Sequence, residues 1–406
     1  MRITKSVSLM LLAGVASIGV VQPSMALEAQ AFLDRVTLVY KTIGYDLSFG
    51  EGRVEGDSVI ATGVKAGIAG LDTFDLPTEI TFSGITERDD GGYLVDEVSI
   101  PDVDAEFAKK PAGHVTLSDI KLEGLYLPGG ETVPAEALLQ LVTSVSTGPL
   151  SVTRDGQEVF SYASFLAGST FTPAQGEPIT DLTSQMAITG LNVDLSTVKE
   201  EDPSAGAVIE ALGLESLSGD INQHLTWSMA DGHMVMDQFL LDFADVGALD
   251  INLDVTGLTP AALEQLYAMQ AAAAVSDPTS EEAQSAQMMA GMQLMQAISI
   301  VSAKVRYDDA SLAGKLLDFF ASQSGGDRAT FVAGIKSMLP TLIDQSGIPT
   351  LKDVVVPPVS AFLDDPQSLE VTVQPENPTT LLVLTAAAAN PARLIAALGL
   401  AITANE

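Results

Sequence analysis

The chain has 406 residues, no cysteine, and 53 acidic against 19 basic side chains, which gives a formal charge of −34. The missing cysteines exclude disulfides, thiolate metal ligands and a cysteine nucleophile. The charge argues against nucleic acid as a partner, because a polyanion binder needs clustered Lys and Arg, and residues 200–303 contain neither. We interpret the acidic residues as solvated faces that keep the protein soluble, with a basic partner or loosely held divalent cations as the alternative.

The first 26 residues have the pattern of a secretory signal peptide. Arg2 and Lys5 precede an apolar run over 7–21, and the small residues around Met25 suit cleavage after Ala26. The run is shorter than the roughly 20 residues that span a bilayer. We therefore predict a periplasmic or secreted mature protein that begins at Leu27 and keeps no transmembrane segment.

Hydrophobic spacing predicts a first helix with Phe32, Val36 and Val39 on one side, followed by a β-rich region. Strands are expected at Tyr45–Phe49, at Val54 with Val59–Thr62, and at Glu79–Phe82, Tyr93–Ile100 and Val115–Leu122. An apolar stripe predicts a helix at Pro134–Val145. Next come strands within Ser151–Ser164 and at Gln185–Leu195, a loop at Lys199–Pro203 and a helix at Ser204–Leu212.

Residues 217–256 alternate apolar and polar side chains around two turn signals, which predicts a three-stranded antiparallel meander. With Asp231-Gly232 as a two-residue turn, Ala230 faces His233 and Trp227 faces Met236. This register places Leu225, Trp227, Met229, Met234, Met236 and Leu240 on one face, which we expect to be buried. The opposite face receives His224, Thr226, Ser228, His233 and Asp237.

Beyond Gly257 the pattern becomes mainly helical. Helices are expected from Pro260 to Ala274 and at Ser280–Ile298, Leu312–Ser322, Arg328–Leu342 and Val356–Leu363, with strands at Lys304–Tyr307 and Ser368–Val373. The fold class is therefore α+β, with a mostly antiparallel sheet of meanders and hairpins and amphipathic helices concentrated in the C-terminal third. We divide the mature chain into a β-rich region, 27–257, and a helix-rich region, 258–406, that packs on the sheet; both can belong to one domain.

Chemical motifs are scarce. The chain has no nucleophile elbow, P-loop, zinc-protease helix or dinucleotide-binding glycine pattern. His114, His224 and His233 are candidates for a metal site or a general base, but the predicted hairpin separates the last two by roughly 20 Å at 3.3 Å per residue. Acidic runs at 102–106 and 250–254 suit solvent-facing strands better than a calcium loop. We predict no catalytic residue, metal or cofactor.

Methionines suggest one possible binding surface. Met288, Met292 and Met295 share a helical stripe, and such stripes fill cores or line adaptable apolar grooves. If this helix stands off the sheet, the space between it and the face with Trp227, Met229, Met234 and Met236 would admit an acyl chain.

The segment Val305–Leu317, VRYDDASLAGKLL, and the run of short strands that close in Gly-Leu resemble bacterial periplasmic proteins of the AsmA-like type. The usual retained N-terminal anchor of that type is replaced here by a cleavable signal. The resemblance implies a role in envelope maintenance or lipid handling, and it implies no catalytic residues.

The sequence thus favours a non-enzymatic secreted or periplasmic protein that binds an apolar, lipid-like ligand or an envelope partner. A hydrolase with an unrecognised active site is one alternative, and a purely structural envelope or surface protein is another. Ligand identity and oligomeric state are left open by the sequence.

Overall fold

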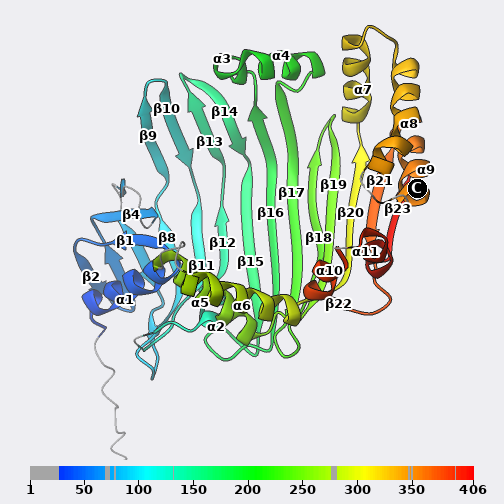
Figure 1. The fold of residues 1–406 in the computed structure, drawn as a ribbon. Coiled ribbons are helices and arrows are strands. Elements are labelled where there is room, and N and C mark those ends of the chain that lie inside the picture. The colour runs from blue at the N-terminus through cyan, green and yellow to red at the C-terminus, as the bar shows by residue number, and fades with distance from the viewer. Residues whose placement is uncertain are drawn as a thin grey trace, which may run out of the picture.

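Alternating apolar and polar residues form strands along much of the chain, and these strands assemble into one broad, curved antiparallel sheet (Figure 1). A computed structural model describes residues 27–68, 74–76, 79–130, 132–275, 281–345, 348, 351–388 and 390–406. The predicted signal peptide, 1–26, lies outside the described residues. The fold class is α+β, as predicted, with the helices mostly in the C-terminal half.

The main series of paired strands runs the length of the sheet. Its order is β2 (Gly52–Glu55), β3 (Ser58–Ala61), β6 (Ile80–Ser83), β8 (Tyr93–Ile100), β11 (Ile120–Leu127), β12 (Val142–Thr147), β15 (Ser164–Thr172), β16 (Asp181–Asp194), β17 (Ser216–Ser228), β18 (His233–Phe243), β19 (Gly247–Thr256), β20 (Ser299–Asp309), β21 (Ser368–Val373) and β23 (Leu400–Ala404). The strands β19 and β20 pair with each other and lie on opposite sides of the predicted boundary at Gly257. The β-rich and helix-rich regions therefore share this sheet.

Shorter strands extend the series at three places. A branch of β14 (Gln157–Tyr162), β13 (Leu150–Arg154), β10 (Ala112–Leu117) and β9 (Val103–Lys109) leaves the far end of β16, beyond its ladder with β15. The strands β7 (Thr86–Glu87) and β22 (Thr379–Thr380) pair with β8 and β20. A separate small sheet contains β1 (Tyr45–Ser48), β4 (Val64–Ile68) and β5 (Phe74–Leu76).

Helices lie around the two ends of the strands (Figure 1). They are α1 (Ala29–Thr42), α2 (Ala135–Leu138), α3 (Val198–Glu201), α4 (Pro203–Leu212), α5 (Pro260–Val275), α6 (Glu281–Ala297), α7 (Leu312–Gln323), α8 (Arg328–Gln345), α9 (Leu351–Asp364), α10 (Leu381–Ala388) and α11 (Pro391–Leu398). As predicted, α1 buries Phe32, Val36 and Val39, which join a core with β3, β6, β8 and β11. The C-terminal stop of α4 at Gly213, with φ of 64°, is also confirmed.

The predicted helix at Pro134–Val145 is wrong beyond its first turn. Only α2 is helical there, and β12 begins at Val142. The residues of β12 are mostly β-branched or small, which favours a strand, and β11 and β15 supply ladders on both sides. The tertiary pairing therefore overrides the helical spacing of the leucines and valines.

Two neighbouring predictions also need correction. The single strand expected at Val115–Leu122 is divided between β10 and β11, because Asp119 adopts a left-handed turn conformation with φ of 52°. The loop expected at Lys199–Pro203 contains the short helix α3, and Asp202 then caps α4 by accepting from the backbone N–H groups of Ser204 and Ala205.

The predicted meander is confirmed as β17, β18 and β19, but its register differs by two residues. Trp227 lies opposite Met234, so the first two strands are joined by four residues, Met229–Gly232, and not by a two-residue turn. The longer connection forms because Met229 turns into the core, where its backbone N–H donates to the Thr180 carbonyl at 2.7 Å. Side chains alternate between the two faces with a period of two residues. A register shift of two residues therefore leaves each residue near the turn on its predicted face.

Leu240, however, lies on the face opposite to the predicted one. Leu225 is opposite Met236 and His224 is opposite Gln238, which leaves Asp237 as an extra residue, a β-bulge in β18. The bulge reverses the alternation beyond it. Leu240 therefore shares a face with Asn222, its partner across the ladder.

Candidate functional site

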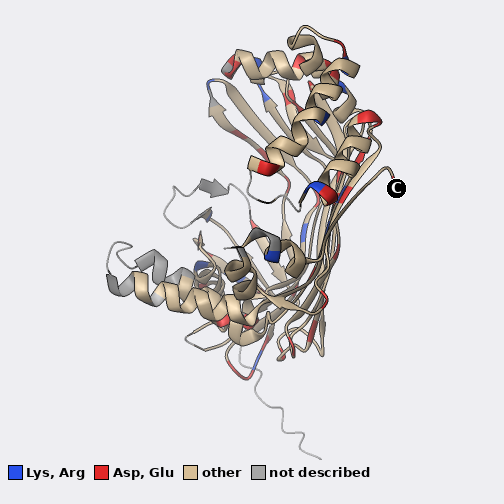
Figure 2. Ribbon diagram, turned by 45° about the vertical axis from the view of Figure 1, so that its right-hand side comes forward, with Lys and Arg blue, Asp and Glu red and all other residues tan. Residues whose placement is uncertain are grey.

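The two faces of the sheet differ, and one of them bears the helices. On this face, which we call the inner face, Trp227 packs against Leu263 of α5. Farther along the same face, Tyr307 makes an edge-to-face contact with Phe362 of α9, with ring centroids 6.4 Å apart. Figure 2 shows the helices projecting from one side of the sheet in two groups, α5 and α6 at the lower end and α7 to α9 at the upper end.

Between these groups the inner face consists of three cross-strand rows, which we call the central inner face. The first row runs through directly paired residues on eight strands: Phe165, Ile188, Ile221, Leu241, Leu249, Tyr307, Leu369 and Ala404. The second contains Ala167, Met186, Gln223 and Phe239, and continues through Ile251, Val305, Val371 and Ile402. The third contains Leu225, Met236, Leu253, Ala303, Val373 and Leu400. All of these residues are uncharged.

Charged residues occupy the outer face of the same strands. Lys304 forms an ion pair with Asp250 at 3.6 Å, and Arg306 forms one with Glu370 at 3.5 Å. Asp220 and Asp242 lie directly opposite each other on β17 and β18. The strands thus separate their side chains by polarity, as expected when one sheet face meets water and the other an apolar layer.

The strongly buried residues of the inner face lie toward its two ends. At the upper end Leu191, opposite Gly219, is 5% exposed. Trp227 is 8% exposed and Val255 is 6% exposed at the level of α5. In the three central rows, by contrast, none of the named residues is buried, and Val305 is 41% exposed. Among the described helices none crosses the middle of the sheet in the view of Figure 1. A contiguous apolar surface that stays partly exposed to solvent often marks a site that binds a ligand, a protein or a membrane.

Tyr307 fixes the β20 part of the first row to the upper helices. Its hydroxyl lies 2.9 Å from the Val246 carbonyl and 2.8 Å from Asp309 Oδ1, and the same carboxylate accepts from the Ala313 N–H in the first turn of α7. Burial, and then the hydrogen bond to Asp309, raise the pKa of Tyr307 above its usual value. The neutral hydroxyl therefore holds the start of α7 against β20.

The seven residues predicted to line a groove fall into separate places. Trp227, Met229 and Met234 belong to the lower cluster, which includes Leu263 and Leu266 of α5. Met236 lies in the third central row. On α6, Met288 and Met292 are 66% and 43% exposed and Met295 is half-buried. Of the α6 residues whose side chains the structure describes, none belongs to the Trp227 cluster, in which Leu263 and Leu266 of α5 pack.

Sequence reasoning missed most of the central inner face. Alternation within β16 or β19 signals a half-apolar strand, but it does not say that Ile188 and Leu249 belong to one row. That row depends on pairings between strands far apart in the chain, such as β19 with β20 and β20 with β21.

Each of the three histidines is paired with one aspartate. His114 Nε2 lies 2.6 Å from Asp104, His224 Nδ1 lies 2.6 Å from Asp237, and His233 Nε2 lies 2.8 Å from Asp254. Across the part of the chain that the structure describes, no group of three or more metal-ligating side chains gathers.

His224 borders a hollow of about 250 Å³. The residues that line it are Leu166, Gln185, Met186, Ala187, Asn222, Gln223, His224 and Gln238. This set contains no hydroxyl, thiol or amine nucleophile beside the imidazole, so the hollow lacks the partner that covalent hydrolysis requires.

Within the described ranges, no helix is long and apolar enough to cross a membrane.

The C-terminal part of the chain matches a protein-family model. None of the curated proteins matches the chain. A family model described as an uncharacterized protein matches residues 240–405, which contain β19 to β23 and α5 to α11 and therefore the C-terminal part of the central inner face.

Proposed function

We propose that this protein is a non-enzymatic binding protein of the periplasm or extracellular space, and that an apolar, lipid-like ligand lies on the central inner face. The observation that carries the proposal is the uncharged, half-exposed surface of the three rows in a chain with 53 acidic residues. Leaving apolar area in water costs about 25 cal/mol per Å², so a ligand that covers it gains free energy.

The dimensions of this surface favour an extended chain. The first row crosses seven strand pairings, which is roughly 34 Å at about 4.8 Å between strands. One bilayer leaflet has a hydrocarbon depth of roughly 15 Å, half of the ~30 Å core. The row is therefore long enough for one or two acyl chains that run across the strands.

The side-chain chemistry also favours binding over catalysis. The histidines lie in isolated pairs with aspartate, and the half-exposed rows contain aliphatic and aromatic side chains with few polar groups. The signal-like residues 1–26 and the AsmA-like resemblance of Val305–Leu317 support an exported, lipid-handling role. Within this proposal, an envelope protein that covers the same face is the alternative to a lipid-like ligand.

The proposal predicts that the protein purified from an exporting bacterium contains lipid. Mass spectrometry of an organic extract should find acyl-chain lipid in stoichiometric amount. Ile221→Glu places a charge in the first row and should reduce the bound lipid at least about tenfold, which corresponds to ~1.4 kcal/mol.

Asn222→Glu is the matched control, because Asn222 is the next residue and lies on the outer face. It should keep the lipid content of the unmodified protein. Lipid-free protein from the exporting host, or equal losses in the two variants, would count against the central inner face as the binding surface. Turnover on a panel of esters or glycosides would favour the hydrolase alternative instead.

A further inference from the structure

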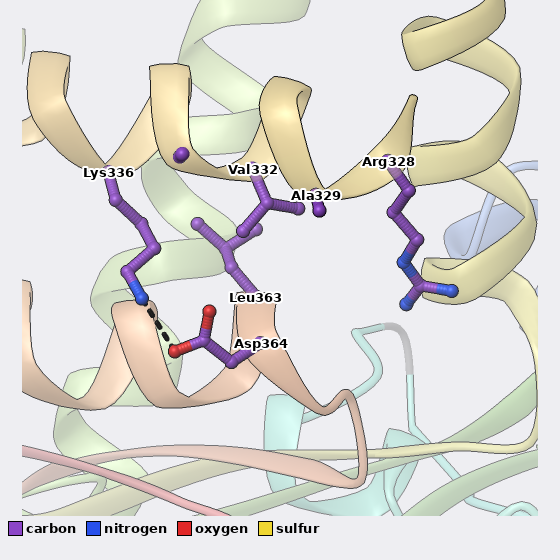
Figure 3. A pocket seen from close by; sticks show the side chains of 7 residues that line it. Arg328, Ala329, Val332, Lys336, Leu363 and Asp364 are labelled. Atoms are coloured by element: carbon purple, nitrogen blue, oxygen red, sulfur yellow. Dashed lines mark hydrogen bonds and ion pairs between the residues drawn. The ribbon is translucent and has the colours of Figure 1, made fainter. Parts of the chain in front are cut away.

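A pocket of about 550 Å³ lies between α8 and the end of α9 (Figure 3). Arg328 and Lys336 of α8 stand at its two ends, and Ala329, Val332 and Leu363 form an apolar floor between them. The two cations are eight residues apart on one helix, which is roughly 12 Å at 1.5 Å per residue. A basic rim around an apolar floor suits a molecule that has both an anionic group and a hydrocarbon part.

Both cations already have carboxylate partners, but these partners are largely exposed to water. Lys336 Nζ lies 2.5 Å from Asp364, and an Arg328 guanidinium nitrogen lies 3.8 Å from Asp318. The cationic side chains are 32% and 36% exposed, whereas Asp364 and Asp318 are 57% and 64% exposed. Such partly exposed pairs contribute at most about 1 kcal/mol. An incoming anion can therefore displace a carboxylate from its cation. The carboxylate side chain then rotates toward the solvent, and the cation stays in place.

One turn of α9 lies between the pocket and the central inner face. Leu363 lines the pocket, and the preceding residue, Phe362, packs on Tyr307 of the first row. Lys304 and Arg306 of the neighbouring strand are engaged with acidic partners on the outer face. The cations of α8 are thus placed where a ligand on the inner face can reach them.

We infer that the ligand is an anionic amphiphile, whose anionic group is held by Lys336 and Arg328 and whose acyl chain continues past α9 onto the central inner face. The inference rests on the proposed function and specifies its ligand class. Because the chain has a formal charge of −34, an anion needs such a local pair of cations to offset the general repulsion.

The test compares two probes of equal chain length on the full, lipid-free protein. Palmitate has an anionic head and hexadecanol a neutral one, so palmitate should bind about tenfold more tightly if a cation holds the head. Lys336→Gln should remove this advantage and leave hexadecanol binding unchanged. Asp364→Asn removes the competing carboxylate and should tighten palmitate binding, an effect opposite to that of a merely damaged helix.

Lys352→Gln serves as the matched control, because Lys352 forms a similar ion pair with Asp344 at 2.6 Å and does not line the pocket. It should leave the affinities for both probes unchanged. Equal affinities for the two probes, unaffected by Lys336→Gln, would overturn the anionic-group site while the proposed function stands. Failure of both probes to bind would contradict the proposed function itself. Equally tight binding of inorganic phosphate alone would show a free-anion site and would also overturn the inference.

Discussion

Trp227 shows how one side chain joins the meander to the helical region. Its ring is 8% exposed in a cluster with Leu182 and Leu263, and its indole N–H donates to the Leu258 carbonyl at 2.9 Å. The hydrogen bond satisfies the polar atom of a buried aromatic residue and fixes the chain just before α5. His224, only three residues earlier, points to the outer face and pairs with Asp237.

We therefore expect Trp227→Ala to lower the free energy of unfolding by roughly 3–5 kcal/mol, the range for large aromatic residues in a core. His224→Ala should cost less than about 1 kcal/mol, because an exposed charge pair contributes little. Urea denaturation followed by circular dichroism measures both. If His224→Ala lowers the free energy of unfolding more than Trp227→Ala does, the inner and outer faces are assigned the wrong way round.

At the level of the element, one extra residue in β18 changes which of its side chains face inward. Before the bulge at Asp237 the inner face receives Met234 and Met236, and after it the inner face receives Phe239 and Leu241. Without the bulge, strict alternation would turn Leu240 and Asp242 inward. The bulge thus decides which residues in the second half of β18 contribute to the central inner face.

Deletion of Asp237 should accordingly preserve the two faces of the strand, because Gln238 then follows Met236 directly and Phe239 and Leu241 stay on the inner face. We expect the deletion and Asp237→Ala to lower the free energy of unfolding by similar amounts, within about 1 kcal/mol, because both remove the exposed pair with His224. Urea denaturation measures both variants. A deletion that costs several kcal/mol more than the substitution would show that the bulge itself is needed for the register.

At the scale of the whole molecule, the excess of acidic residues opposes the compact state. Fifty-three acidic side chains face 19 basic ones, and residues 200–303, which include β17, β18 and β19, have no Lys or Arg at all. Ion pairs such as Lys304 with Asp250 offset this repulsion only locally. The net effect of the charges is therefore expected to be destabilising.

Salt should consequently stabilise the protein. Raising sodium chloride from about 0.01 M to about 0.15 M shortens the screening length from roughly 30 Å to roughly 8 Å, which weakens repulsion between distant carboxylates. Differential scanning calorimetry should show a rising unfolding temperature over this range. A falling temperature would mean that the ion pairs contribute more than the general repulsion.

Local patterns were sufficient for much of the fold. The α1 helix, the strand β8, the meander, and the helices from α5 to α9 follow from periodicity and capping signals that act within a few residues. The cysteine-free composition and the acidic charge likewise required no structure. These features are local or additive, so the sequence by itself determined them.

The remaining features depend on which strands meet. Val142 to Thr147 became a strand because β11 and β15 lie beside it, and Met229 entered the core because the Thr180 carbonyl accepts its N–H. The central inner face exists only once eight strands from distant parts of the chain place their apolar residues in register. The α8–α9 pocket likewise brings Lys336 of α8 to Asp364 of α9. Cross-strand and interhelical pairing decided these features, because side chains far apart in sequence can share a surface only after the backbone has folded.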